Sequence, residues 1–233
     1  MNVGLYQGAS AMAASEARLE AITSNLASAR STAFKRVASA QHGAEARANR
    51  SETVRPDSFK VVDWSQGLLE RTGVPTDLAL MGQGFFAVEG PEGEVYTRDG
   101  QFFVDESGQL VTQERFPVAW EGARGNLDPV GDPIKVGEDG SVWQGARNIG
   151  RLSIVDFPAL DQLELDGNGY WQASPALNRI ASTAEVHQGA LEGANVSTID
   201  EMVSLIQTQR SFEAGSQVVR LISQTYERLN SFR

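Results

Sequence analysis

Hydrophobic residues recur every seven positions at the start of the chain. Leu5, Met12, Leu19 and Leu26 follow this spacing, and Ile22 adds a position three residues after Leu19. Such a repeat is typical of the seam along which two helices of a coiled coil pack. The other positions up to residue 30 are mostly Ala and Ser, whereas a solvated helix normally carries a polar face. The pattern predicts an N-terminal helix within residues 1–36 that packs closely on several sides.

The same spacing returns at the end of the chain. The residues of this second seam are Met202, Leu205, Phe212, Val219, Ile222, Tyr226 and Leu229. Two pairs just before it fit a capping box, in which side chains bond the free amide groups of a helix start: Ser197 with Asp200, or Thr198 with Glu201. The sequence predicts a C-terminal helix within residues 186–233.

Between the two helices the hydrophobic period changes to two, and Gly-containing turns are frequent. Three stretches show the strand, turn, strand pattern of a β-hairpin, at residues 85–97, 102–112 and 134–143. A further strand is expected at residues 152–155. We therefore expect an all-β domain at residues 70–185.

Residues 37–69 are expected to be an extended connector, because residues 37–63 are polar, poor in aromatic side chains and without a clear period. Neither terminal helix is expected to be stable alone, since isolated helices are marginal in water. We predict an α+β fold in which the N- and C-terminal helices pair as a coiled-coil-like α domain, with the all-β domain inserted between them. An apolar stripe also suits the core of a single domain. The scarcity of charge on the N-terminal helix favours further protein copies as partners.

The negative charge of the chain is concentrated in its middle. The formal net charge is −10, and residues 64–185 carry 19 acidic and 8 basic residues, while both ends are nearly neutral. An acidic body argues against nucleic acid and anionic lipid as partners. No apolar run approaches the roughly 20 residues of a membrane-spanning helix, so no direct membrane insertion is expected. The first residues also lack the basic and apolar regions of a secretory signal peptide.

The residues give little support to enzyme or metal chemistry. Cys is absent, and the two histidines, His42 and His187, belong to no ligand-like spacing. Residues 166–169 resemble the start of a calcium loop but lack its later acidic ligands, so they fit a tight turn better. Gly82 and Gly84 precede a strand, whereas a phosphate cradle opens a helix. We expect no catalytic residue, no cofactor and no metal site.

Four groups of motifs, in order along the chain, resemble those of the bacterial flagellar rod and hook proteins. They are Ser24-Asn25-Leu26-Ala27 with Thr32-Ala33-Phe34-Lys35-Arg36; Gln66-Gly67-Leu68-Leu69 with residues 77–86; residues 96–102 with 108–112; and residues 189–196 with Glu201-Met202-Val203 and residues 209–213. The residues taken to carry the match are Asn25, Leu26, Ala27, Phe34, Lys35, Gly82, Gly84, Phe85, Phe86, Asn195, Val196 and Arg210. The chain departs from the family pattern at Ser28, Ala33 and Ala194, where the family usually has Asn, Gly and Ser.

The resemblance implies a structural subunit of the flagellar basal-body rod and not an enzyme. Its implied partners are copies of itself, other flagellar rod and hook proteins, and the flagellar type III export apparatus. It also implies export without a cleaved signal peptide and polymerisation through the terminal helices into the hollow periplasmic drive shaft. The short stretch 37–63 favours the proximal rod subunit over the distal one.

Two other functions stay open on the residues alone. One is a β-rich binding or adhesin-like module with a helical oligomerisation stalk, in which Trp120, Trp143 and Trp171 would line a glycan groove. The other is an acid–base hydrolase that uses carboxylates of the middle domain, but no carboxylate spacing supports it.

Overall fold

The fold is α+β and divides into two compact units. The computed structural model describes residues 3–41, 58–166 and 169–231, and within these ranges it leaves undescribed the side chains of residues 3–7, 41, 58, 226 and 229–231. Unit 1 comprises Met1–Ala29, Arg36–Asp63 and Val196–Arg233, and unit 2 comprises Arg30–Lys35 and Trp64–Asn195. Each unit is therefore built from segments that lie far apart in the sequence.

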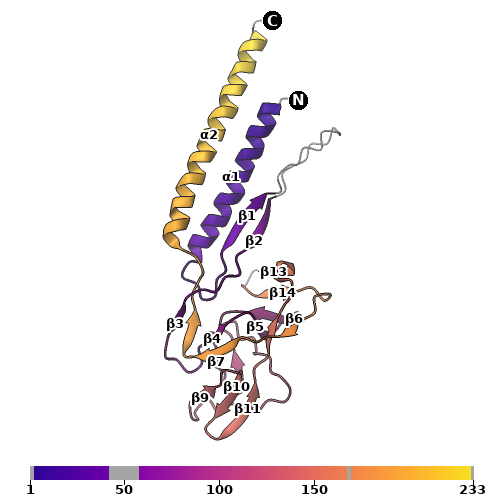
Figure 1. Cartoon of the computed structure of the whole chain (residues 1–233), viewed down its shortest axis with the longest axis vertical. Helices are drawn as coiled ribbons and strands as arrows, with labels where there is room; N and C mark the ends of the chain where they lie inside the picture. Colours follow the sequence, from indigo (N-terminus) through magenta and orange to yellow (C-terminus); the bar gives the residue numbers. More distant parts are fainter. Residues whose placement is uncertain (1–2, 42–57, 167–168, 232–233) are drawn as a thin grey trace. The chain divides into compact units, whose positions relative to one another are not determined.

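Unit 1 contains two long helices and a pair of strands. The elements are α1 (Val3–Ala27), α2 (Thr198–Ser231), β1 (Val37–Gln41) and β2 (Ser58–Val62). The helices lie side by side and run antiparallel (Figure 1). β1 and β2 also pair antiparallel, with Val37 opposite Val62. The sequence did not predict this pairing, because residues 38–40 are small and show no strand alternation.

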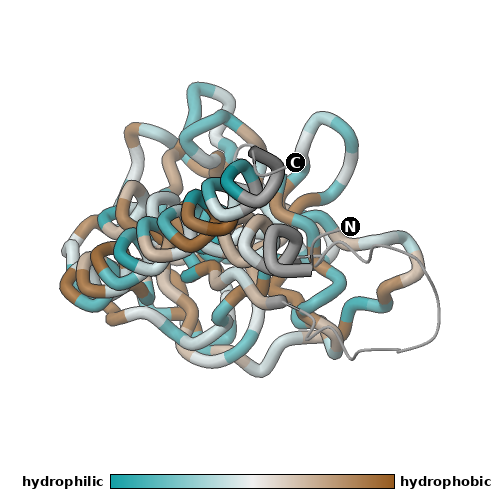
Figure 2. The backbone as a smooth tube through the Cα atoms, turned by 90° about the horizontal axis from the view of Figure 1, so that it is seen from above, coloured by the Kyte–Doolittle hydropathy of each residue, from teal (hydrophilic) through white to brown (hydrophobic). Residues whose placement is uncertain are grey.

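The two helices approach closely where one of them carries glycine. A Cβ atom on Gly8 would lie 2.4 Å from Cγ2 of Val219, and a Cβ atom on Gly215 would lie 3.5 Å from Cγ of Met12. A missing side chain at these positions lets the opposite side chain reach the helix backbone. Along α2, hydrophobic positions alternate with hydrophilic ones, as Figure 2 shows.

The start of α2 is fixed by Ser197. The Asp200 amide donates a hydrogen bond to Ser197 Oγ (3.4 Å), and the Glu201 amide donates to the Ser197 carbonyl (3.0 Å). Ser197 is thus the N-cap, and Asp200 and Glu201 place negative charge on the positive end of the helix dipole. Of the two predicted capping boxes, the Ser197–Asp200 box thus shows the bond from the Asp200 amide to the Ser197 side chain. In the Thr198–Glu201 alternative the carboxylate would have to accept a bond from the start of the helix, but the Glu201 carboxylate accepts one from Arg36 instead.

Unit 2 is rich in short strands. They are β3 (Leu69–Arg71), β4 (Leu78–Met81), β5 (Phe85–Gly90), β6 (Gly93–Thr97), β7 (Phe103–Val104), β8 (Leu110–Val111), β9 (Ile134–Val136), β10 (Ser141–Gln144), β11 (Arg147–Arg151), β12 (Ile154–Asp156), β13 (Leu163–Leu165), β14 (Trp171–Ala173), β15 (Ile180–Ala181), β16 (Glu185–Gln188) and β17 (Ala190–Glu192). A short 3-10 helix, Leu160–Gln162, precedes β13.

These strands form several small sheets around one main core. Within the described residues the largest sheet has the order β13-β14-β6-β5-β12-β15, and β11-β10-β9 form another. β16 pairs with β4, and β17 pairs with β3. The core contains Leu80, Phe86, Phe102, Leu110 and Leu152, all fully buried. Phe86 and Phe102 meet edge to face, with ring centroids 5.2 Å apart.

The three predicted hairpins are confirmed, because β5 pairs with β6, β7 with β8 and β9 with β10, each antiparallel. The strand expected at residues 152–155 is present as β12, displaced by about a residue or two, which is ordinary for a strand boundary. Residues before the C-terminal helix form strands that the sequence did not predict. β16 and β17 return to pair with the strands near the start of unit 2 and so join its two ends.

Candidate assembly interface and its charged anchors

Most of the described side chains of the two predicted seams are half-buried. Ile22 is buried at 4% exposure. Half-buried seam residues are Met12, Leu19, Leu26, Leu205, Phe212, Val219 and Ile222. Met202 is 52% exposed. Leu5, Tyr226 and Leu229 belong to the helices, but their side chains are outside the description. Two helices alone thus bury the seam only in part.

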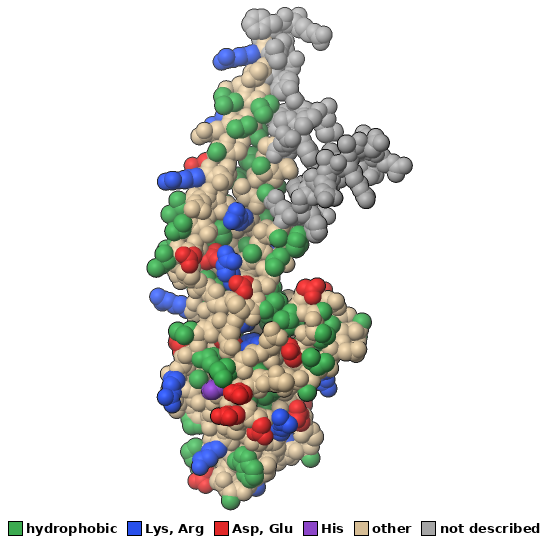
Figure 3. Space-filling model, in the orientation of Figure 1, with side chains coloured by type: hydrophobic (Ala, Val, Ile, Leu, Met, Phe, Trp, Pro, Cys, Tyr) green, Lys and Arg blue, Asp and Glu red, His purple; other side chains and the backbone are tan. Residues whose placement is uncertain are grey.

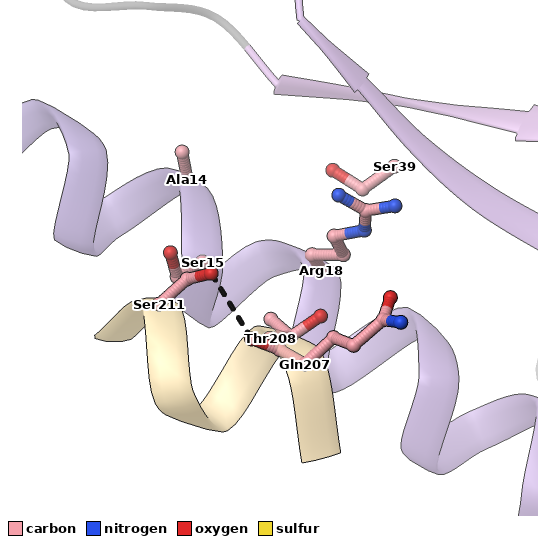
Figure 4. Close-up of a pocket in the computed structure, with 7 residues that line it drawn as sticks. All are labelled: Ala14, Ser15, Arg18, Ser39, Gln207, Thr208 and Ser211. Carbon is pink, nitrogen blue, oxygen red and sulfur yellow. Dashed lines mark hydrogen bonds between the residues drawn. The ribbon is translucent and has the colours of Figure 1, made fainter. Parts of the chain in front are cut away.

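A polar groove opens beside this helix pair (Figure 4). Its volume is about 420 Å³, and the residues that line it are Ala14, Ser15, Arg18, Ser39, Gln207, Thr208 and Ser211. The hydroxyls of Ser15, Thr208 and Ser211 each donate to the carbonyl four residues earlier in their own helix. These groups already have partners, so the groove offers small side chains for packing and not a set of reactive groups.

The side of α2 that faces away from α1 carries large apolar side chains that are exposed to solvent. Between 48% and 75% of each is exposed, and the residues are Ile199, Met202, Val203, Ile206, Val218 and Leu221. Only Met202 was predicted as part of an interface. The others escaped prediction because the search followed one seven-residue register, and none of them falls in it.

A buried ion cluster in unit 2 collects several of the motif residues. Lys35 Nζ lies 2.6 Å from Glu192 Oε1, and Arg98 Nη1 lies 3.3 Å from Glu192 Oε2. The Gly67 amide donates a third bond to this carboxylate (3.0 Å). The Glu192 side chain is fully buried, as is nearly all of Lys35. A buried carboxylate is tolerated only when its charge is compensated and its oxygens are bonded, and both conditions hold here.

Glycines make room for this cluster. A Cβ atom on Gly67 would lie 1.9 Å from the Gly193 carbonyl oxygen, so only glycine allows the backbone to pass there. Arg98 Nη2 also donates to the Gly82 carbonyl (2.7 Å), and its guanidinium lies 5.5 Å from the centre of the Phe85 ring. Burial lowers the pKa of Arg98, although the Glu192 carboxylate opposes this shift.

The remaining glycine of this motif and the aromatic residue after it have packing roles. Gly84 adopts a positive φ of 148°, and a Cβ atom there would lie 2.3 Å from Ser182 Oγ. Phe86 is in the main core. The sequence singled out Lys35, Gly82, Gly84, Phe85 and Phe86 but missed Arg98 and Glu192. Both missed residues lie within the quoted motifs. Glu192 is a charged residue in a buried strand, and Arg98 directly follows the buried residues that end β6.

A second ion pair lies in unit 1. Arg36 Nε donates to Glu201 Oε1 at 2.5 Å, and the Glu201 side chain is 2% exposed. Lys35 and Arg36 are neighbours in sequence, yet they bond glutamates of different units. Both cations follow α1 in the sequence. Lys35 pairs with Glu192, shortly before α2, in unit 2, and Arg36 pairs with Glu201, in the first turn of α2, in unit 1.

Two asparagines of the motifs bond backbone groups. Asn25 Nδ2 donates to the Val37 carbonyl (2.8 Å), and the Val37 amide donates to Asn25 Oδ1 (2.9 Å). Asn195 Nδ2 donates to the Ser65 carbonyl (2.9 Å), and the backbone N–H of Asn195 donates to the Phe34 carbonyl (3.2 Å). An amide side chain has both a donor and an acceptor, which suits these positions.

The other motif residues lie nearer the surface. Leu26 and Val196 are half-buried, and Ala27 is exposed on α1. Arg210 is exposed on α2, and among the described residues no carboxylate lies within 4 Å of it. The motif therefore combines buried anchors with residues on the helix surface.

Within the described residues, no group of three or more His, Cys, Asp or Glu side chains is placed to hold a metal ion. No described helix is both long and apolar enough to cross a membrane. The three tryptophans of the binding-module hypothesis do not line a common surface, because Trp171 is buried and Trp120 is half-buried, while Trp143 is 40% exposed. The glycan groove expected under that hypothesis is therefore wrong.

The N-terminal and C-terminal helices share one unit, and comparison with known proteins places this α+β chain in a family. Residues 79–144 match the flagellar hook protein FlgE/F/G D1 domain, and residues 187–232 match the C-terminal domain of the flagellar basal body rod FlgEFG proteins. The chain belongs to the flagellar rod and hook protein family.

Two relatives carry the name flagellar basal-body rod protein FlgF. That of Caulobacter vibrioides is 34% identical over 97% of this chain and 95% of the relative, and that of Mesorhizobium japonicum is 32% identical over 94% and 93%. The flagellar basal-body rod protein FlgG of Buchnera aphidicola subsp. Schizaphis graminum is 35% identical over 76% and 72%. These relatives are consistent with a proximal rod subunit.

Proposed function

We propose that this protein is a structural subunit of the flagellar basal-body rod and polymerises through its terminal helices into the hollow periplasmic drive shaft. The observation that carries the proposal is the state of α2: its inner side chains are only half-buried against α1, and its outer apolar side chains are exposed. The names of the relatives support the rod as its location.

In this proposal α1 and α2 form a coiled-coil-like α domain, and residues 70–185 are an inserted β domain. The predicted bounds of the α domain, residues 1–36 and 186–233 with residues 37–69 as a connector, need correction. β16 and β17 belong to unit 2, and β1 and β2, which lie within the predicted connector, pair in unit 1. Helices that are marginal alone become stable when neighbouring copies cover their apolar sides. A contact between two different faces of the same chain does not close on itself, so it extends a helical filament.

The proposed role needs no catalysis and no cofactor. The partners are other copies of this chain, other rod and hook proteins, and the flagellar type III export apparatus, which would deliver the chain without a cleaved signal peptide. Within the rod we assign the chain to the proximal segment and keep the distal segment as the near alternative. The short stretch 37–63 and the FlgF relatives that match almost end to end support the proximal assignment.

Deletion of the chain tests this function. We expect basal bodies isolated from the deletion strain to lack a complete rod when imaged by electron microscopy, and the cells to be non-motile. Expression of the wild-type chain from a plasmid should restore both. Intact rods and normal swimming in the deletion strain would refute the proposal.

A further inference from the structure

The first two turns of α2 form an apolar patch on its outer side. Ile199, Met202, Val203 and Ile206 make up this outer patch, and each is at least 48% exposed. At 100° per residue they point away from Glu201, Leu205 and Thr208, which are buried or half-buried on the inner side. Four large apolar side chains in two turns exceed the scattered exposure that is normal for a surface, so a partner is expected there.

Further along the same outer side, the patch is followed by exposed charged residues with a net positive charge, Arg210, Glu213 and Arg220. Arg210 and Arg220 are both exposed, and within the described residues neither has a carboxylate within 4 Å. The side of unit 1 seen in Figure 3 shows hydrophobic, basic and acidic side chains along the helices. A partner for the outer side of α2 should therefore offer room for large apolar groups and negative charge next to it.

The outer side of α1 has this complementary character. Ala9, Ala13, Glu16, Glu20 and Ala27 are exposed and follow one another along a single helix face. The alanines leave space, and the two glutamates supply charge. Glu16 has no cation within 4 Å among the described residues. Glu20 meets Lys60 at 3.3 Å, but both side chains are 70% exposed, so this pair is weak.

The two outer sides cannot meet within one chain. α1 and α2 pack against each other through their inner sides, with Met12 near Gly215 and Val219 near Gly8. The outer patch of α2 points away from α1, and the face of α1 that bears Ala9 and Glu16 lies about a quarter of a turn from the side that bears Gly8 and Met12. The large apolar side chains of α2 can therefore meet the alanines of α1, and the arginines of α2 the glutamates of α1, only when the two helices belong to different copies of the chain.

We propose that the outer patch of α2 (Ile199, Met202, Val203, Ile206) docks on the outer side of α1 of a second copy, with Arg210 facing Glu16. This inference rests on the proposed function and specifies which faces meet. Parallel pairing of two α2 patches with each other is disfavoured, because it would bring the arginines of both copies together. The proposed contact joins different faces, so each copy keeps one free face of each kind and the chain of copies continues.

The absence of Cys in the chain allows a direct cross-linking test. The full-length chain would carry Val203→Cys together with Ala9→Cys, Ala13→Cys or Ala27→Cys and be oxidised under assembly conditions. At least one double variant should give a ladder of covalent oligomers, since each copy has both faces. Each single variant should give no ladder, and an equal mixture of the two matching single variants should give only dimers. Ala13→Cys with Ala146→Cys, an exposed turn of unit 2, is the matched control and should give no ladder.

Charge reversal tests the proposed orientation in the same assay. Glu16→Arg should lower the ladder yield roughly threefold to tenfold, as expected for one interfacial charge pair, and Arg210→Glu in the same chain should restore it. Dimers from Val203→Cys alone would show α2 packed on α2 and overturn the inference. Polymers that form without any cross-link between the two outer sides would overturn it while leaving the proposed function intact. Absence of the chain from isolated rods would instead refute the proposed function.

Discussion

Lys35 Nζ and Glu192 Oε1 lie 2.6 Å apart in the interior of unit 2, although 157 positions separate the two residues in the sequence. The pair joins the segment that follows α1 to the segment that precedes α2. Arg36 and Glu201 do the same in unit 1. Two ion pairs thus join segments far apart in the sequence, one within each unit.

Removal of the Glu192 charge should destabilise unit 2 strongly. Glu192→Gln leaves Lys35 and Arg98 buried without a counter-charge, a situation that costs roughly 3–5 kcal/mol. All four tryptophans lie within residues 64–171, so the fluorescence change in urea reports the unfolding of unit 2. Glu121→Gln is the control, because Glu121 and Arg151 form an exposed pair worth about 0–1 kcal/mol. Equal effects of the two substitutions would contradict the assigned role of the buried cluster.

Ala33→Gly should stabilise the protein. Ala33 has a φ of 57°, a left-handed conformation that costs a residue with a Cβ atom roughly 1–2 kcal/mol, and glycine avoids this cost at the expense of some chain entropy. We expect a gain of about 0.5–1 kcal/mol in the urea unfolding of unit 2. Ala87→Gly, in the buried strand β5, should lower the stability instead. A loss of stability with Ala33→Gly would show that the backbone there is not strained.

Asn25→Ala should loosen the junction between α1 and β1. The substitution removes a donor to the Val37 carbonyl and an acceptor from the Val37 amide, and each lost bond at a buried site costs about 1–3 kcal/mol. Hydrogen exchange of the Val37 amide should become faster by at least tenfold. Asn25→Asp keeps the acceptor for this amide, so its exchange should remain closer to the wild-type rate. Unchanged exchange in Asn25→Ala would rule out this bond.

The stability of unit 2 should fall at alkaline pH through Tyr170. Burial, together with the hydrogen bond to the Glu114 carboxylate, raises the pKa of Tyr170 above its usual value of 10.0. The unfolded chain therefore loses this proton from about pH 10 upward while the folded chain keeps it, so unfolding becomes easier as the pH rises.

Tyr170→Phe removes this titrating group. The variant should lose about 1 kcal/mol at neutral pH with the hydrogen bond, and its unfolding free energy should fall less steeply than that of the wild type above pH 10. Urea unfolding at several pH values between 8 and 12 measures both effects. Parallel pH profiles of the two proteins would contradict the raised pKa.

Local patterns in the sequence were sufficient to predict the helices and the hairpins. The spacing from Leu5 to Leu26 and from Leu205 to Tyr226 identified α1 and α2, and Ser197 marked the start of α2. The Gly-containing turns identified the hairpins, because a turn and its two strands are neighbours in sequence.

Features that join distant segments could not be predicted in this way. β1 consists largely of small or polar residues, and its first residue, Val37, is bonded to Asn25 of α1, twelve positions earlier. In the sequence, Glu192 and Arg98 resemble ordinary surface charges. In the fold, Glu192 forms ion pairs with both Lys35 and Arg98. A buried charge is defined by its partners, and these lie far away in the sequence.

The central claim is that the terminal helices, and not unit 2, build the rod. Leu19→Glu places a charge in the half-buried contact of α1 with α2, whereas Leu165→Glu makes the same change at a 49% exposed leucine of unit 2. The decisive measurement is the amount of each variant in basal bodies isolated from cells that express no other copy of the chain. We predict that Leu165→Glu is incorporated like the wild type, while Leu19→Glu is absent from the rod although tryptophan fluorescence shows a folded unit 2. Incorporation of Leu19→Glu at the wild-type level would contradict the claim.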